Sequence, residues 1–102
     1  MTLIHVIVSF RDGGTEDVWN GRRSKVARKT CPDNILDVAH RKLDMINQAV
    51  RLNDLKVPPE NRLEGLKGDR AGQCSVRIND QFRVCLYWTE AGATDVEITD
   101  YH

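Results

Sequence analysis

The sequence ends in three polar residues whose side chains could carry acid–base chemistry. Asp100, Tyr101 and His102 follow directly on residues 96–99, where apolar and polar residues alternate as in a β-strand. Histidine is the only side chain whose unperturbed pKa lies near neutrality, so a His102 held by a strand could move protons at working pH. The alternative is that the three residues only cap a strand, because a three-residue motif is weakly specific.

A second group of candidates is a cluster of basic residues in the first half of the chain. Its members are Arg22, Arg23, Lys25, Arg28 and Lys29. Such a cluster is most often a solvated helix face, but it could also contact a phosphate backbone. The chain as a whole holds 15 basic and 15 acidic residues, so its overall charge gives no attraction to nucleic acid or to a membrane.

The composition indicates a single soluble domain that spans residues 1–102. Hydrophobic residues make up 40% and charged residues 29% of the chain, which is ordinary for a globular protein. The three cysteines follow no metal-ligand spacing, so we expect neither a metal nor another cofactor. The apolar stretch 3–8 is too short for a membrane span and lacks the basic start of a signal peptide. We therefore expect a reduced, cytoplasmic protein with no membrane partner.

The elements that must position these residues begin with a strand and three helical segments. Residues 3–10 are rich in β-branched side chains and end at a glycine turn, which predicts a strand. Thr15 is the expected N-cap of a short helix through Trp19, and residues 23–31 predict a second helix. The clearest helix follows, capped by Asp33 or Asn34, and Pro58 with Pro59 predicts an extended loop beyond it. The apolar residues that recur in this helix are Ile35, Ala39, Leu43, Ile46 and Val50.

The second half of the chain predicts three short strands, roughly at residues 74–78, 82–88 and 95–100. Their period-two alternation places one apolar set against the helices and another set on an open face. The residues expected on the open face are Ser75, Arg77, Arg83, Cys85, Thr99 and Tyr101. Two arginines and a tyrosine beside the terminal histidine describe a plausible anion-binding surface.

Three blocks of sequence together resemble the HigB toxins, a branch of the RelE/ParE superfamily of bacterial toxin–antitoxin systems. The blocks are residues 66–73 (Leu-Lys-Gly-Asp-Arg-Ala-Gly-Gln), residues 75–84 and the closing Asp-Tyr-His, and they occur in the family's order and spacing. The similarity runs from about residue 9 to the end. It implies a compact α+β, RelE-like fold, in which an N-terminal strand and helices pack on a twisted, mostly antiparallel sheet.

The resemblance also implies an activity and partners. The implied activity is ribosome-dependent cleavage of messenger RNA by an endoribonuclease toxin, and the implied inhibitor is a HigA-like antitoxin with a helix-turn-helix domain. Such chemistry uses the 2′-hydroxyl of the RNA as nucleophile, so it needs no metal. It does need a general base, a general acid and cations that stabilise the charge of the transition state.

The roles carry over to matching positions of this sequence. His102 is the expected general acid, and Arg83 and Lys67 are expected to neutralise developing charge on the phosphate. Tyr101 would stack on a base or orient the scissile phosphate. Asp100 would position the tail or tune His102 through a hydrogen bond.

Two departures from the family pattern affect these expectations. Several relatives carry a histidine where this chain has Glu64; a carboxylate can be the base if burial or a hydrogen bond raises its pKa, as the resemblance to YoeB-type toxins suggests. The alternative is an exposed Glu64 beside Arg62. The second departure is the neutral charge, with a sequence pI of about 6.8, so contact with RNA or the ribosome should depend on local patches. Those patches are Arg22, Arg23, Lys25, Arg28, Lys29 and Arg77.

Two other functions remain open on the same fold. One is a non-enzymatic, ParE-like gyrase poison, although the terminal Tyr-His favours the enzyme. The other is a toxin remnant kept as a regulatory protein that binds antitoxin and operator. Fold alone does not decide among them, because one fold hosts several activities.

Overall fold

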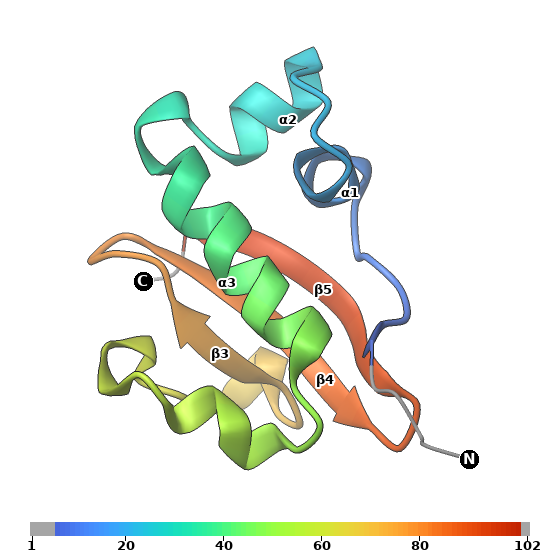
Figure 1. The fold of residues 1–102 in the computed structure, drawn as a ribbon, viewed down its shortest axis with the longest axis vertical. Helices are drawn as coiled ribbons and strands as arrows, with labels where there is room; N and C mark the ends of the chain where they lie inside the picture. Colours follow the sequence, from blue (N-terminus) through green and yellow to red (C-terminus); the bar gives the residue numbers. More distant parts are fainter. Residues whose placement is uncertain (1–5, 101–102) are drawn as a thin grey trace.

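The computed structural model describes residues 6–100, and two of the candidates, Tyr101 and His102, lie outside this range (Figure 1). Its elements in chain order are β1 (Val6–Ile7), α1 (Gly13–Trp19), α2 (Lys25–Thr30), α3 (Leu36–Gln48), β2 (Glu64–Gly65), β3 (Cys74–Arg77), β4 (Phe82–Thr89) and β5 (Gly92–Asp100). The expected α+β class is confirmed.

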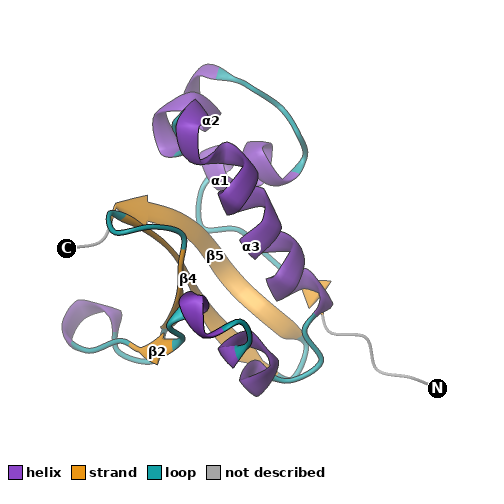
Figure 2. Ribbon diagram, turned by 60° about the vertical axis from the view of Figure 1, so that its left-hand side comes forward, coloured by secondary structure: helices purple, strands orange, loops and turns teal. Residues whose placement is uncertain are grey.

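One five-stranded sheet, in the order β1-β5-β4-β3-β2, forms the centre of the molecule. The pairs β2–β3, β3–β4 and β4–β5 are antiparallel, and only β1 runs parallel to its neighbour β5. Figure 2 shows α1, α2 and α3 together on one side of the sheet, and β2 is the edge strand next to β3. The prediction of a mostly antiparallel sheet covered by helices is therefore confirmed.

The first helix begins one turn earlier than the sequence predicted. Asp12, not Thr15, is the N-cap, and its Oδ1 accepts a hydrogen bond from the backbone N–H of Thr15 at 2.6 Å. Thr15 is fully buried, and its Oγ1 accepts a hydrogen bond from the backbone N–H of Ile98 at 3.0 Å. The prediction was wrong because the threonine hydroxyl joins α1 to β5 and a carboxylate takes the capping role.

The expected caps of the long helix were also wrong. Residues Asp33–Ile35 form a 3-10 turn, and α3 follows with Ile35 as an N-cap that makes no side-chain hydrogen bond. The periodic residues Ala39, Leu43 and Ile46 are fully buried, as predicted. Val50 lies beyond the end of α3 and is 57% exposed, so it does not belong to the apolar stripe.

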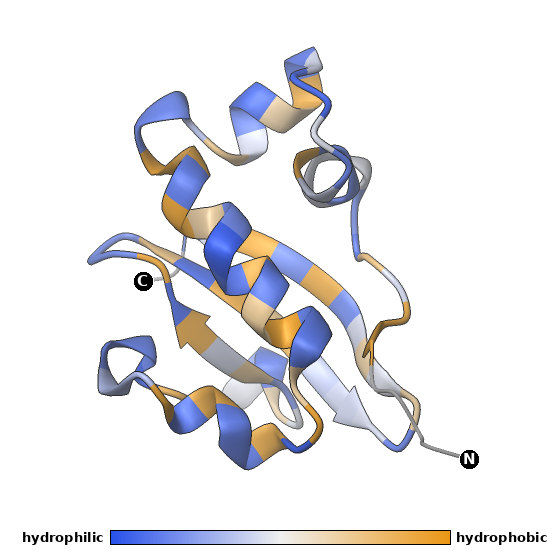
Figure 3. Ribbon diagram, viewed as in Figure 1, coloured by the Kyte–Doolittle hydropathy of each residue, from blue (hydrophilic) through white to orange (hydrophobic). Residues whose placement is uncertain are grey.

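The main core lies between α3 and one face of the sheet. Val76, Val84 and Ile98 are register partners across β3, β4 and β5, and all three are buried. Figure 3 shows the alternation of hydrophobic and hydrophilic residues along β5 that produces this face. The period-two alternation therefore predicted correctly that these three residues face the helices.

The segment between α3 and β3 is more ordered than the extended loop that the sequence predicted. It contains the 3-10 turns η2 (Leu52–Lys56) and η3 (Pro59–Asn61), then β2, then the 3-10 turn η4 (Gly68–Arg70). Strand β2 was not predicted, because two residues are too short to show an alternation. It adds Glu64 to the edge of the sheet, opposite Ser75 of β3.

Candidate active site

The sheet face opposite α3 carries two of the four predicted catalytic residues that the structure describes, Glu64 and Arg83. We call it the α3-distal face. Its register forms two neighbouring cross-strand rows, one of Glu64, Ser75, Cys85 and Glu97, the other of Arg77, Arg83 and Thr99.

Arg83 lies on the α3-distal face, and several contacts fix its guanidinium. Its Nη1 donates hydrogen bonds to Ser75 Oγ at 2.8 Å and to the carbonyl oxygen of Arg62 at 3.4 Å. The same nitrogen lies 3.4 Å from Glu64 Oε1, which makes an ion pair. The Arg83 side chain is only 16% exposed. Its guanidinium is therefore held in one place by contacts with β2, β3 and the turn before β2.

Glu64 lies beside Arg83 but is more open to solvent. Its side chain is 50% exposed, so a bound substrate could reach the carboxylate. Its cationic partner is Arg83; Arg62, the neighbour named in the alternative, contributes its carbonyl oxygen to Arg83. The structure thus brings Glu64 and Arg83 together, as a carboxylate and a guanidinium on one accessible face.

Lys67 and Asp100 lie at the borders of this region. Lys67 is exposed and stands at the start of η4, three residues after Glu64. Asp100 is the last residue of β5, pairs with Phe82 in the register, and its Oδ2 accepts a hydrogen bond from Gln81 Nε2 at 2.9 Å. Because Thr99 is the register partner of Arg83, the described end of β5 runs beside the Arg83 backbone, whereas the guanidinium contacts β3 and β2 on the other side of β4.

Sequence reasoning missed a second ionic cluster on the same face. Arg70 Nη1 donates to Glu97 Oε1 and to Gln73 Oε1, each at 3.0 Å, and Arg11 Nε lies 3.8 Å from the same Glu97 oxygen. Two signals could have found it. Arg70 belongs to the Leu-Lys-Gly-Asp-Arg block, and Glu97 alternates with Val96 and Ile98 along β5.

The face is not open at its centre. Ser75 and Cys85, expected on an open surface, are fully buried. Burial raises the pKa of the Cys85 thiol, although the Arg70 guanidinium acts in the opposite direction, and burial raises the pKa of Cys74 to about 11. The expectation that Cys85 lies on an open face was therefore wrong, and its thiol is poorly placed to react, since a reactive thiol must be reachable and readily ionised.

The basic cluster lies elsewhere, on and before α2. Arg22 Nη1 is 3.9 Å from Asp17 Oδ1, and Arg23 is paired with Asp33 and donates to the Cys31 carbonyl oxygen at 3.2 Å. Lys25, Arg28 and Lys29 are exposed on α2. Figure 2 shows α2 at the top of the molecule and β2 at the bottom. The structure does not bring this cluster together with Glu64 and Arg83.

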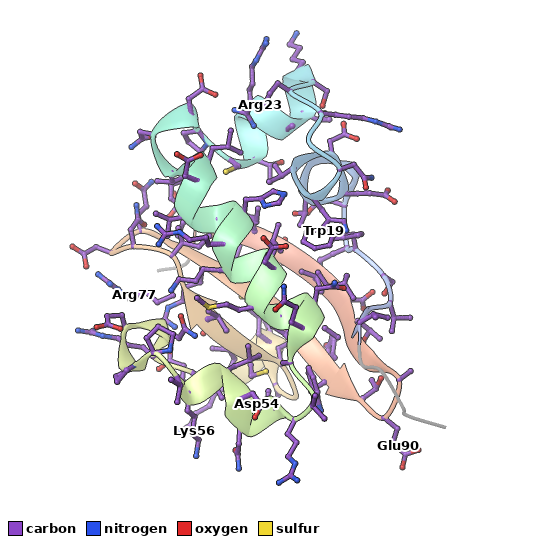
Figure 4. The ribbon with its side chains drawn as sticks, viewed as in Figure 1. Trp19, Arg23, Asp54, Lys56, Arg77 and Glu90 are labelled. Atoms are coloured by element: carbon purple, nitrogen blue, oxygen red, sulfur yellow. The ribbon has the colours of Figure 1, made fainter. Side chains whose placement is uncertain are left out.

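Arg77, the remaining candidate for RNA contact, belongs to the sheet. It is the register partner of Arg83 and is paired with Asp80 in the turn after β3. Figure 4 shows Arg77 beside the sheet, well away from Arg23 at the α2 end. Within residues 6–100, no three histidine, cysteine, aspartate or glutamate side chains are grouped to hold a metal, and no helix is long and apolar enough to cross a membrane.

Comparisons with known proteins give the family. The family model described as "RelE-like toxin of type II toxin-antitoxin system HigB" matches residues 8–102. The chain is 39% identical over 86 residues to Toxin HigB-1 of Vibrio cholerae serotype O1, covering 84% of this chain and 87% of that protein. It is 44% identical over 55 residues to an uncharacterized protein of Haemophilus influenzae, covering 54% and 52% respectively. The chain therefore belongs to the HigB-like family of RelE-like toxins in type II toxin–antitoxin systems, a family that implies an antitoxin partner.

Proposed function

We propose that this toxin is a ribosome-dependent mRNA endoribonuclease that acts in the cytoplasm and is inhibited by a HigA-like helix-turn-helix antitoxin. The RNA 2′-hydroxyl is the nucleophile, and the protein supplies acid–base groups and cations without a metal. The observation that carries the proposal is the pairing of Arg83, held by three oxygen atoms, with the half-exposed Glu64 on one face.

Arg83 is suited to stabilise the phosphate during cleavage. Each contact that fixes it to another residue within 6–100 goes through Nη1, whereas a guanidinium has five N–H donors. Nε and Nη2 are therefore the atoms that would bind two phosphate oxygens as a planar fork. Because the protein already holds the guanidinium, little reorganisation is needed when charge develops in the transition state.

Glu64 is the proposed general base for the 2′-hydroxyl. Its carboxylate is half exposed, so a substrate can reach it. A base must be ionised to accept a proton, and the guanidinium at 3.4 Å is compatible with a carboxylate. Lys67, exposed three residues later, is the proposed second cation for the phosphate.

The general acid is proposed to be His102, with Tyr101 against a base or the phosphate and Asp100 as their anchor. A C-terminal extension should therefore reduce toxicity more than the same extension at the N-terminus. Growth after induction of the two tagged proteins measures this difference. Equal growth arrest would count against a role for the tail.

Docking on RNA or the ribosome is proposed to use Lys25, Arg28 and Lys29 more than their neighbours. Arg22 and Arg23 contact Asp17 and Asp33, which reduces their freedom to bind phosphate. Arg77, paired with Asp80, is a candidate for the same role near the active site.

The test is cleavage of a defined mRNA by the purified protein, with and without ribosomes. We expect cuts only when ribosomes are present, and their loss in Glu64→Gln. Cleavage of free mRNA at an equal rate would contradict ribosome dependence. Gyrase inhibition with intact mRNA would instead support the ParE-like alternative, and growth without arrest would support a regulatory remnant.

A further inference from the structure

One short segment, residues 61–73, carries both Glu64 and Lys67. It begins at the buried Asn61 and returns to the sheet at the buried Gln73, where β3 starts. Between these ends, Glu64 pairs with Ser75, and the Leu66 N–H donates to the Gln73 carbonyl oxygen at 2.8 Å. The position of both proposed catalytic groups therefore depends on what holds this segment.

The start of the segment is anchored on the α3 side. Asn61 Oδ1 accepts a hydrogen bond from Lys42 Nζ at 2.6 Å, and its Nδ2 donates to the Leu55 carbonyl oxygen at 3.1 Å. This anchor precedes Glu64 by three residues. The η4 turn, which follows Lys67, has its own backbone hydrogen bonds, and a further interaction links it to the sheet.

That interaction is the Arg70–Glu97 ion pair. Glu97 and Glu64 stand at opposite ends of one cross-strand row, three strand spacings apart, which is about 14 Å at the usual ~4.8 Å per strand. Arg70 reaches from η4 to β5 and contacts Glu97 at 3.0 Å. The segment is thereby tied to the middle of the sheet as well as to its β2 edge.

Residues beneath the segment are buried, as expected if residues 61–73 pack against the sheet. Leu66 and Cys85 are both buried, yet neither belongs to the core between α3 and the sheet. Glu97 and Arg70 are themselves 17% and 27% exposed. A well-bonded pair at this depth is costly to break, because removal of one partner leaves the other charge poorly solvated.

We propose that Glu97 is a positioning residue, which holds the η4 turn through Arg70 and so sets the place of Lys67 relative to Arg83. The proposal rests on the function proposed above. Arg11 also contacts Glu97, at 3.8 Å, so one carboxylate joins η4, β5 and the chain before α1. Glu97 itself does not touch the substrate; it acts through Arg70.

The primary test is Glu97→Gln in single-turnover cleavage of ribosome-bound mRNA. We expect the maximal rate to fall about ten- to a hundredfold, as for a catalytic group displaced by about 1 Å, with the half-saturating ribosome concentration changed less than about twofold. Glu90→Gln is the matched control, because it removes the same charge from an exposed site between β4 and β5 (Figure 4). Equal effects of the two substitutions would overturn the proposal.

A double-mutant cycle distinguishes positioning of Lys67 from a general structural role. If Glu97 acts through Lys67, the double variant Lys67→Met/Glu97→Gln should lose no more activity than Lys67→Met alone. Multiplicative losses would overturn the positioning role. Should Glu97→Gln fail to fold, Arg70→Lys keeps the charge and removes the guanidinium whose Nη1 joins Gln73 to Glu97, and the same cycle applies.

Amide hydrogen exchange tests the ion pair without any cleavage assay. Glu97→Gln should accelerate exchange at residues 66–73 and leave β3 and β4 unchanged. Unchanged exchange at residues 66–73 would overturn the role of the ion pair, whatever the activity. If the wild-type protein cuts no mRNA, the proposed function fails, and hydrogen exchange alone then tests whether the Arg70–Glu97 ion pair holds residues 66–73.

Discussion

The α3-distal face and the α2 end of the molecule both carry cations, but they hold them differently. On the α3-distal face, Arg83 and Arg70 each contact several oxygen atoms and are mostly buried. On α2, Lys25, Arg28 and Lys29 are exposed side chains of a six-residue helix. Fixed cations suit the stabilisation of one transition state, whereas exposed cations suit docking on a phosphate backbone.

This difference leads to separate kinetic signatures. Loss of a fixed cation should lower the maximal cleavage rate at any salt concentration, because the missing interaction belongs to the transition state. Loss of exposed cations should weaken association and reduce its salt dependence while the maximal rate is kept. The following predictions test this separation, in order of decreasing expected effect.

Arg83→Lys should have the largest effect. Lysine keeps the charge but cannot hold Ser75 and the Arg62 carbonyl while it also binds phosphate as a fork. We expect single-turnover cleavage to fall about a hundred- to a thousandfold at saturating ribosomes. Arg41→Lys, on the exposed side of α3, is the control and should cut at the wild-type rate. A wild-type rate in Arg83→Lys would remove this residue from the mechanism.

Glu64→Gln should come next, with a loss of about a hundredfold, the lower range for a general base. The substitution keeps the size of the side chain and its place opposite Ser75. Rates measured across pH separate a general base from a structural group. The wild-type rate should rise with pH where the base loses its proton, and the rate of the variant should show no such rise. A parallel pH profile in the variant would show that another group is the base.

Combined substitution of Lys25, Arg28 and Lys29 by glutamine should weaken ribosome association about tenfold and leave the saturated rate unchanged. The slope of log affinity against log salt should fall by about one for each phosphate that the variant no longer neutralises. Ribosome binding at several salt concentrations measures both values. An unchanged affinity and slope would mean that these three residues form only a solvated surface.

The buried cysteines give a smaller and purely structural prediction. All three cysteines are buried, and burial raises the pKa of Cys31, Cys74 and Cys85, so less thiolate exists at a given pH than for a free thiol. Native protein at pH 8 should react with a thiol reagent much more slowly than unfolded protein. Glu97→Gln should accelerate labelling of Cys85 more than of Cys31. Rapid labelling of Cys85 in the wild type would contradict a closed α3-distal face.

Local sequence patterns predicted which residues lie on the α3-distal face and which form the basic cluster, but not which of these residues contact one another. The alternation along β4 and β5 placed Arg83 and Thr99 on the correct face, because side-chain direction in a strand depends on sequence position alone. The basic cluster on and before α2 was visible because its members are close together in the sequence. Which of them are engaged was not visible, since the partners Asp17 and Asp33 are chosen by the packing of α1 and of the turn before α3.

The rest of the α3-distal face depends on contacts between distant residues. Arg70 and Glu97 are 27 positions apart, and Arg83 reaches the Arg62 carbonyl across 21 positions. Neither interaction leaves a periodic signal in the sequence. Thr15 is a second example. Threonine is a good N-cap by residue type, but the Thr15 hydroxyl accepts a hydrogen bond from Ile98, 83 positions away.

The most direct test of the division between fixed and docking cations is single-turnover cleavage at saturating ribosomes, compared for Arg83→Lys and for the triple glutamine variant of α2. We expect the first to be slow at every salt concentration and the second to reach the wild-type rate. Equal losses in the two variants, or a wild-type rate in Arg83→Lys, would contradict this division.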